Sequence, residues 1–289
     1  MAVLSAAKPS DFVNLLELFP VNKLKGHWPQ IKGKKEDIAK SIVAQQKTSA
    51  ITEFVDRYFS CCKQHIYVFS HNGEIKKLPT AGTGTGERVS ERMDDGEGSA
   101  LFLYWAEFNA VLTDPFEAKE IRFLWPFRFE LTKTTAIVRL VVLEKNFSAQ
   151  FNGREYIAAK KVTDEQVLVA AMLKTAALPF SRTDLHKGIK KLWKDDLVDC
   201  VRVDYKDPYS TESTTMDAER GIREKKPALY NSLLTVPLLN AKFKIKSKKL
   251  SDISHFYTKP SEGYLAFARY SEHEGDTDNV VREILKHNG

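Results

Sequence analysis

The sequence predicts an α+β protein: a small all-helical N-terminal domain followed by a mixed body with an antiparallel β-meander and packed helices. Three observations support this. Apolar residues recur at helical spacing in the first 65 residues, three long β-branched and aromatic runs follow residue 100, and helical and strand patterns then alternate to the C-terminus. We therefore expect a helical domain at 1–65 and an α+β domain at 66–289, with a possible sub-boundary near 162.

Four helices are predicted in the N-terminal domain. Apolar residues at helical spacing indicate helices within 9–20, 21–28 and 47–64, and the acidic residues Glu36 and Asp37 favour another that starts near residue 36. Pro20 and Pro29 end the first two, because proline cannot continue a helix. Between the second and third helices lies a lysine-rich turn, residues 31–35.

The first part of the larger domain is predicted to be mainly β. Residues 65–70 have strand composition, and Asn72 with Gly73 suggests a hairpin turn to a strand at 75–78. Residues 79–99 contain five glycines and predict a mobile loop. The glycines at 82–86 are not followed by the Gly-Lys-Ser/Thr of a phosphate-binding loop, so we do not assign them to nucleotide binding.

Three strands of a meander are predicted at 101–112, 120–131 and 135–144. One face of this meander is aromatic, and it consists of Phe102, Tyr104, Phe108, Phe123, Trp125, Phe127 and Phe129. Such a face forms either a core covered by helices or a platform on which unpaired bases stack. The favoured interpretation is the core.

The C-terminal part alternates helices and strands. Helices are predicted at 163–177, 181–193 and 279–287, and strands at 198–205, 241–246 and 263–270. In the strand at 241–246, lysine alternates with apolar residues, so the lysines share one face. We expect this to be an edge strand. Its lysines then either contact nucleic acid or prevent the edge from pairing with another chain.

Composition excludes several classes of protein. The 289-residue chain has 43% hydrophobic and 28% charged residues, as in ordinary globular proteins, and no apolar run approaches the roughly 20 residues of a membrane helix. Its three cysteines cannot form a disulfide framework, and its seven histidines show no metal-binding spacing. We expect no cofactor, no metal and no membrane partner. The N-terminus does not resemble a signal peptide, so the expected location is cytoplasmic, or nuclear in a eukaryote.

Positive charge is concentrated in two parts of the sequence. The net charge is +6, with ten Lys and Arg against six Asp and Glu in residues 1–65 and sixteen against ten in 181–250. This distribution is compatible with a surface that binds phosphates. The candidate nucleic-acid-binding residues fall into three lysine groups: Lys23, Lys25, Lys32, Lys34 and Lys35; Lys187, Lys190, Lys191 and Lys194; and Lys242, Lys244, Lys246, Lys248 and Lys249.

Residues 19–43 resemble the SAP-type DNA-binding motif. Leu24 matches the leucine of the first helix, Gly33 and Lys35 match the turn, and the second helix is matched by Asp37, Ile38 and Ile42. The layout of the chain is also similar to that of the centromere protein N family, in which a helical domain precedes a β-rich one. Here the similarity lies in a helix that ends in Leu-x-Leu-Phe-Pro, then Leu24 and Trp28, then a basic helix. Both resemblances imply binding to DNA or chromatin.

The sequence thus predicts a non-enzymatic protein that binds the phosphate backbone of DNA, with double-stranded DNA as the expected form, either alone or as a subunit of a larger complex. A protein-interaction adaptor is one alternative. Another is a metal-dependent nuclease, because Asp204-Tyr205-Lys206 fits the acid-x-Lys element of restriction-type nucleases. Glu117-Ala118-Lys119 fits the same pattern, and Asp184 or Asp199 would supply the second acid.

Overall fold

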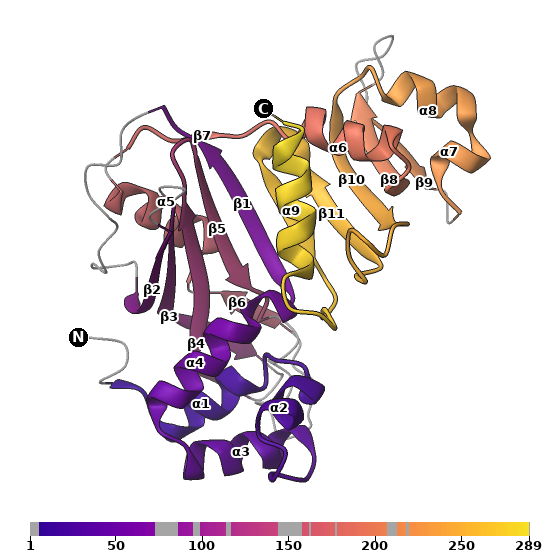
Figure 1. The fold of residues 1–289 in the computed structure, drawn as a ribbon. Helices are drawn as coiled ribbons and strands as arrows, with labels where there is room; N and C mark the ends of the chain where they lie inside the picture. The colour runs from indigo at the N-terminus through magenta and orange to yellow at the C-terminus, as the bar shows by residue number, and fades with distance from the viewer. Residues whose placement is uncertain are drawn as a thin grey trace. The chain divides into compact units, whose positions relative to one another are not determined.

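The computed structural model describes residues 6–72, 86–94, 99–113, 117–143, 158–161, 163–176, 178–206, 213–217 and 220–288. It confirms the α+β class, with helices packed on antiparallel strands (Figure 1). Contacts divide the chain into two compact units. The first comprises Met1–Cys62 and His71–Phe180, and the second comprises Lys63–Ser70 and Ser181–Gly289.

The first unit begins with the helical bundle that the sequence predicts. Its helices are α1 (Pro9–Leu16), α2 (Val21–His27), α3 (Lys35–Gln45) and α4 (Thr48–Tyr58), followed by a 3-10 turn at Phe59–Cys61. Phe19 and Phe54 pack edge to face with ring centroids 5.1 Å apart, and both are fully buried. Gly33 has a φ of +133°, which favours glycine in the turn before α3.

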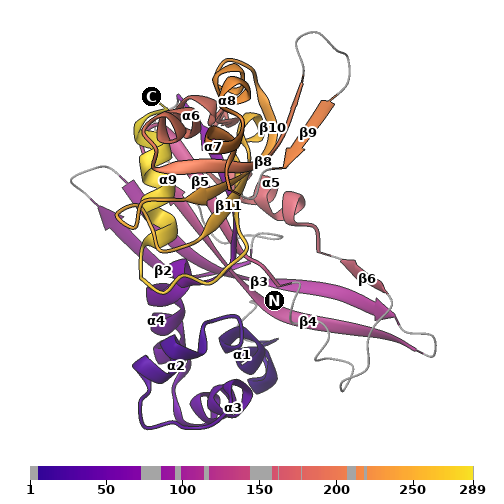
Figure 2. The ribbon, with the colours of Figure 1, turned by 90° about the vertical axis from the view of Figure 1, so that its right-hand side faces the viewer.

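A meander completes the first unit. Strands β2 (Glu87–Asp94), β3 (Ser99–Thr113), β4 (Ala118–Leu131) and β5 (Thr135–Val141) pair in that order, and β6 (Ala158–Lys161) pairs with β3. Figure 2 shows the two long strands β3 and β4 side by side. Residues 87–94, within the stretch predicted as a loop, form β2 instead. The rest of that loop, 79–85 and 95–98, and the predicted strand at 75–78 lie outside the described residues.

The aromatic face of the meander is core. All seven of its aromatic side chains are buried, and Tyr104 stacks on its cross-strand partner Phe127 with ring centroids 5.1 Å apart. Burial raises the pKa of Tyr104 to about 12, although Arg88 opposes this shift. Unpaired bases therefore have no access to these rings, and the alternative of a stacking platform on this sheet is wrong.

A buried ion pair joins the helical bundle to the meander. Asp56 of α4 pairs with Arg128 of β4 at 3.0 Å, and Arg92 of β2 bonds to the same carboxylate. The guanidinium of Arg128 also lies 4.7 Å from the centre of the Phe59 ring. Removal of one partner from such a pair leaves a buried charge uncompensated. The bundle and the meander belong to the same compact unit.

The second unit is an antiparallel sheet with helices on one face. Its strands pair in the order β1 (Gln64–Ser70), β12 (Tyr264–Phe267), β11 (His255–Lys259), β10 (Leu238–Ile245), β8 (Val198–Lys206) and β9 (Ser213–Asp217), while β7 (Ser181–Arg182) also pairs with β1. The helices are α6 (His186–Lys194), α7 (Ile222–Lys225), α8 (Pro227–Leu233) and α9 (Asp276–Lys286). The remaining helix, α5 (Glu165–Thr175), belongs to the first unit. The strand β11 was not predicted from the sequence.

Aromatic rings form the core of the second unit. Trp193 of α6 packs edge to face on Phe243 of β10, which stacks on Phe256 of β11, both at 5.5 Å between ring centroids. Figure 1 shows α6 and α9 on the same side of the strands. The buried residues Val280 and Ile284 belong to α9. One face of the sheet is therefore covered by helices. Within the described part of the chain, no helix has the length and apolar character needed to span a membrane.

Gly188 allows α6 and α9 to approach closely. A Cβ at this position would overlap the backbone carbonyl of Ile284, whereas a Cβ at Gly26 in α2 would meet no atom within 4 Å. We predict that Gly188→Ala lowers the free energy of unfolding by about 1–3 kcal/mol, as overpacking typically does. Gly26→Ala should leave it unchanged or raise it by up to about 1 kcal/mol. Chemical denaturation measures both, and equal stability of the two variants would contradict the close packing.

Candidate nucleic-acid interface

The face of the second sheet opposite the helices carries a cluster of cationic and aromatic side chains. Residues directly opposite each other on antiparallel strands project from the same face. Lys242 of β10 lies opposite Arg202 of β8 on one side and Tyr257 of β11 on the other, and Lys244 lies opposite His255. Lys259 likewise pairs with Tyr264 of β12. We call this surface, formed by Arg202, Lys242, Lys244, His255, Tyr257, Lys259 and Tyr264, the basic face.

The alternation in β10 separates this face from the core. Ala241, Phe243 and Ile245 are buried on the helix side, whereas Lys244 is exposed and Lys242 is half-buried. The strand is paired along both edges, to β8 and to β11. The prediction of an edge strand is therefore wrong, because β11, which was not predicted, pairs with the second edge of β10. The proposal that its lysines protect a sheet edge from pairing fails with it.

A pocket of about 280 Å³ opens on the basic face. It is lined by Arg202, Asp204, Asn240, Ala241, Lys242, Tyr257, Thr258, Lys259 and Tyr264. Three cationic side chains thus surround one carboxylate. The Nζ atom of Lys242 lies 5.3 Å from the centre of the Tyr257 ring, and the amide of Asn240 donates to Asp204 at 3.1 Å. This combination suits a ligand that is anionic, flat and able to donate hydrogen bonds.

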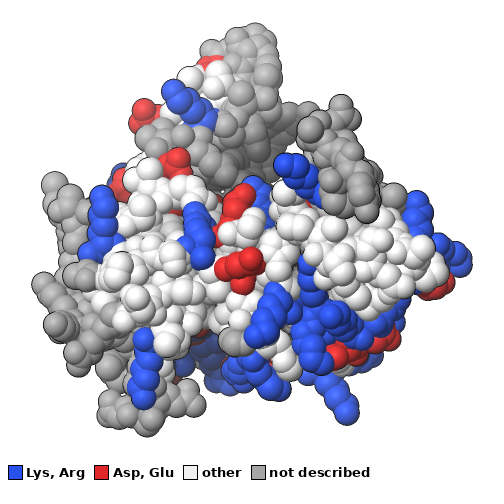
Figure 3. All heavy atoms as spheres, turned by 90° about the horizontal axis from the view of Figure 1, so that it is seen from above, with Lys and Arg blue, Asp and Glu red and all other residues white. Residues whose placement is uncertain are grey.

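The lysines predicted on α6 have intramolecular partners or acidic neighbours. Lys190 donates to the Val236 carbonyl at 2.7 Å, and Lys191 pairs with Asp195 at 2.5 Å. Lys187 and Lys194 are exposed. Figure 3 shows Lys and Arg gathered at the lower right of the view, with Asp and Glu among them. The contacts of Lys190 and Lys191 reduce the positive charge that α6 offers to a phosphate.

The lysines after β10 extend beyond the basic face. Lys246 donates to Asp196 at 2.6 Å, and this aspartate also pairs with Arg223. Hydrogen bonds from Lys246 lower the pKa of Asp196, burial opposes this shift, and a hydrogen bond from Arg223 adds to the lowering. Lys248 and Lys249 are exposed in the turn that follows.

The N-terminal lysines belong to the first unit. Lys23 lies 5.6 Å from the centre of the Tyr58 ring, and Lys35 is half-buried, so that desolvation lowers its pKa while Glu17 opposes the shift. Lys25, Lys32 and Lys34 are exposed. The turn before α3 thus presents two exposed lysines, Lys32 and Lys34, whereas Lys35 is half-buried.

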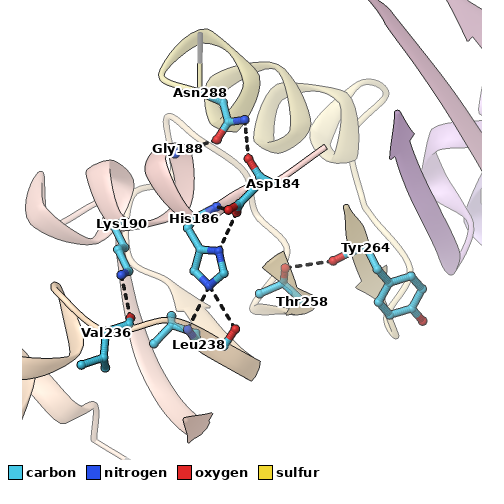
Figure 4. Close-up of polar contacts among 9 residues, drawn as sticks. All are labelled: Asp184, His186, Gly188, Lys190, Val236, Leu238, Thr258, Tyr264 and Asn288. Atoms are coloured by element: carbon cyan, nitrogen blue, oxygen red, sulfur yellow. Dashed lines mark hydrogen bonds and ion pairs between the residues drawn. The ribbon is translucent and has the colours of Figure 1, made fainter. Parts of the chain in front are cut away.

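Asp184 and His186 at the start of α6 have a structural role (Figure 4). The Nδ1 atom of His186 lies 2.5 Å from an Asp184 oxygen, and its Nε2 atom lies 2.9 Å from the Leu238 nitrogen. With the proton on Nδ1, the ring donates to Asp184 and accepts from the backbone of β10. Burial raises the pKa of Asp184, but hydrogen bonds from His186 outweigh this effect and lower it. Asn288 fixes the same segment by donating to the Asp184 carbonyl at 2.6 Å.

The acids proposed for a nuclease have separate partners. Asp184 is engaged by His186, Asp199 accepts from Trp193 Nε1 at 2.9 Å, and Asp204 lies in the pocket beside Asn240. Among the described residues, no three His, Cys, Asp or Glu side chains are grouped so that they could hold a metal ion. This arrangement gives the nuclease alternative no geometric support.

Several residues of the basic face were not singled out from the sequence. Arg202, Asn240, Tyr257, Lys259 and Tyr264 line the pocket from four strands, and no short motif contains them. A signal was nevertheless present, since residues 255–259 read His-Phe-Tyr-Thr-Lys, with the buried Phe256 and Thr258 alternating with more exposed residues. Recognition of this alternation would have placed β11 beside β10.

His255 reports the electrostatic potential of the basic face. Burial lowers its pKa, and the charges of Lys242, Lys244 and Arg269 lower it further. We predict that replacing Lys242 and Lys244 with glutamine raises the pKa of His255, because less positive charge then opposes its protonation. An NMR pH titration of the His255 ring measures this shift. An unchanged pKa would show that the two lysines lie away from the ring.

Comparison with models of protein families, with curated proteins and with solved structures gives no match for this chain.

Proposed function

We propose that this protein binds nucleic acid, in the first place DNA, through phosphate contacts on the basic face. The observation that carries the proposal is the convergence of Arg202, Lys242, Lys244 and Lys259 from three adjacent strands on one exposed sheet face. Lys259 pairs with Glu262 at 3.5 Å. Among the side chains that the structure describes, no ion pair is found for Arg202, Lys242 or Lys244. Clustered cations bind polyanions by releasing the counterions of the phosphates.

The rigidity of the sheet supports this proposal. Pairing on both sides of β10 fixes the spacing of the cations, whereas lysines in loops lose conformational entropy when they bind. Lys242 is also oriented by the Tyr257 ring. By contrast, Lys190 and Lys191 on α6 are engaged by partners within the protein. We therefore expect the basic face to contribute more to binding than α6.

The exposed N-terminal lysines Lys25, Lys32 and Lys34 are proposed as a second, weaker contact. The support for this contact is the resemblance of residues 19–43 to the SAP-type motif, together with the exposure of these side chains. The adaptor alternative predicts a different outcome, namely that none of the three lysine groups affects binding to DNA.

Three variants with equal loss of charge test the proposal. Arg202, Lys242 and Lys244 are replaced by glutamine in the first, Lys187, Lys191 and Lys194 in the second, and Lys25, Lys32 and Lys34 in the third. Affinity for labelled DNA is measured over a series of salt concentrations. Because each phosphate contact contributes about 0.9 to the slope of log K against log salt for duplex DNA, the first variant should reduce that slope by about 2 to 3.

The second variant serves as the matched control, and we expect it to change the slope by less than about 1. Thermal unfolding of all three variants verifies that they are folded. If the wild-type protein shows no salt-dependent binding to DNA, or if the first variant binds as the wild type does, the proposal is wrong.

A further inference from the structure

Tyr257 is an unusual side chain for a phosphate-binding surface. The residue is 40% exposed and lines the pocket, and the Nζ atom of Lys242 lies 5.3 Å from the centre of its ring. Proteins that bind single strands combine basic grooves with exposed aromatic rings on which bases stack. A ring on an inner strand of a sheet is also held in place by its neighbours. Tyr257 therefore offers a fixed stacking surface within reach of the cations.

Asp204 is a second indication that this surface contacts bases as well as phosphates. A carboxylate on a surface that binds only phosphates would weaken binding by repulsion. However, it accepts hydrogen bonds from amino groups, and cytosine, adenine and guanine each carry one, whereas thymine does not. Asn240 donates to Asp204 at 3.1 Å and so orients the carboxylate at the pocket. The carboxylate is therefore placed to select among bases.

The size of the pocket limits what can enter it. Its volume of about 280 Å³ lies just below the range of about 300–1,000 Å³ that is typical of small-molecule sites. A base within a duplex is stacked and paired, so its flat face cannot reach a protein side chain, whereas a base in a single strand can. The pocket therefore suits one unpaired nucleotide.

We propose that this pocket binds one unpaired nucleotide of a single strand, with its base stacked on Tyr257, its amino group donating to Asp204, and its flanking phosphates bound by Arg202, Lys242 and Lys259. This inference rests on the proposed function, and it changes the expected form of DNA from double-stranded to single-stranded. Bases with an amino group are preferred over thymine.

Fluorescence anisotropy with labelled dC12, dT12 and a mixed-sequence duplex tests the inference in the full-length protein. Tyr257→Leu should weaken binding of dC12 by about 5- to 100-fold, the range expected for the loss of one stacked base. Tyr257→Phe, which keeps the ring, should bind as the wild type does. Asp204→Asn should remove most of the preference for dC12 over dT12.

Tyr270→Leu is the matched control. Tyr270 is 39% exposed and has Lys63 4.8 Å from its ring centre, but it does not line the pocket. This variant should bind dC12 with wild-type affinity. RNA oligonucleotides of the same sequences identify the sugar of the preferred strand, and the same dependence on Tyr257 with either sugar supports the pocket.

The outcomes separate this inference from the proposed function. If Tyr257→Leu binds dC12 as well as the wild type, while the variant lacking Arg202, Lys242 and Lys244 loses affinity, the pocket proposal is wrong and phosphate binding stands. If the wild-type protein binds neither single strands nor duplex, both proposals are wrong. A preference of the wild type for duplex over single strands also overturns the pocket proposal.

Discussion

The pairing of β10 on both sides is the constraint on which the proposed site depends. With β8 and β11 as neighbours, the strand cannot rotate, and its alternating sequence is divided between a covered face and an exposed one. The aromatic stack of Trp193, Phe243 and Phe256 holds the covered face. A shift of one residue in register would bury the lysines and expose the phenylalanine. The energy of the core thus fixes the positions of the charges.

The way in which the fold positions each lysine also distinguishes the basic face from the other lysine groups. On α6 the helix geometry brings Lys191 one turn from Asp195, and the nearby backbone accepts from Lys190. In the N-terminal bundle, Lys35 lies against Glu17 and loses exposure. High lysine density therefore does not by itself predict a phosphate-binding surface. What matters is whether the fold holds the charges at fixed positions on an exposed face, and how many of them are already neutralised by contacts within the protein.

Most of the secondary structure could be predicted from the sequence, because periodicity reports which face of an element is buried. The long strands at 101–112 and 120–131 and the helix that begins after Asp164 are examples. The neighbours of β10 could not be predicted in the same way, since pairing between distant strands leaves little trace in a local pattern. As a result, the lysines were recognised but their partners Arg202, Tyr257 and Lys259 were not. The link of Asp56 to Arg128, which joins the helical bundle to the meander, was missed for the same reason.

Localisation of bound nucleic acid without any substitution tests the central claim most directly. The unmodified protein is irradiated with a bound single-stranded oligonucleotide, and the crosslinked peptides are identified by mass spectrometry. Crosslinks should fall within residues 238–245 and 255–259, the two strands that carry Lys242 and Tyr257. Crosslinks confined to α6 or to the N-terminal bundle, with β10 and β11 unlabelled, would contradict the assignment of binding to the basic face.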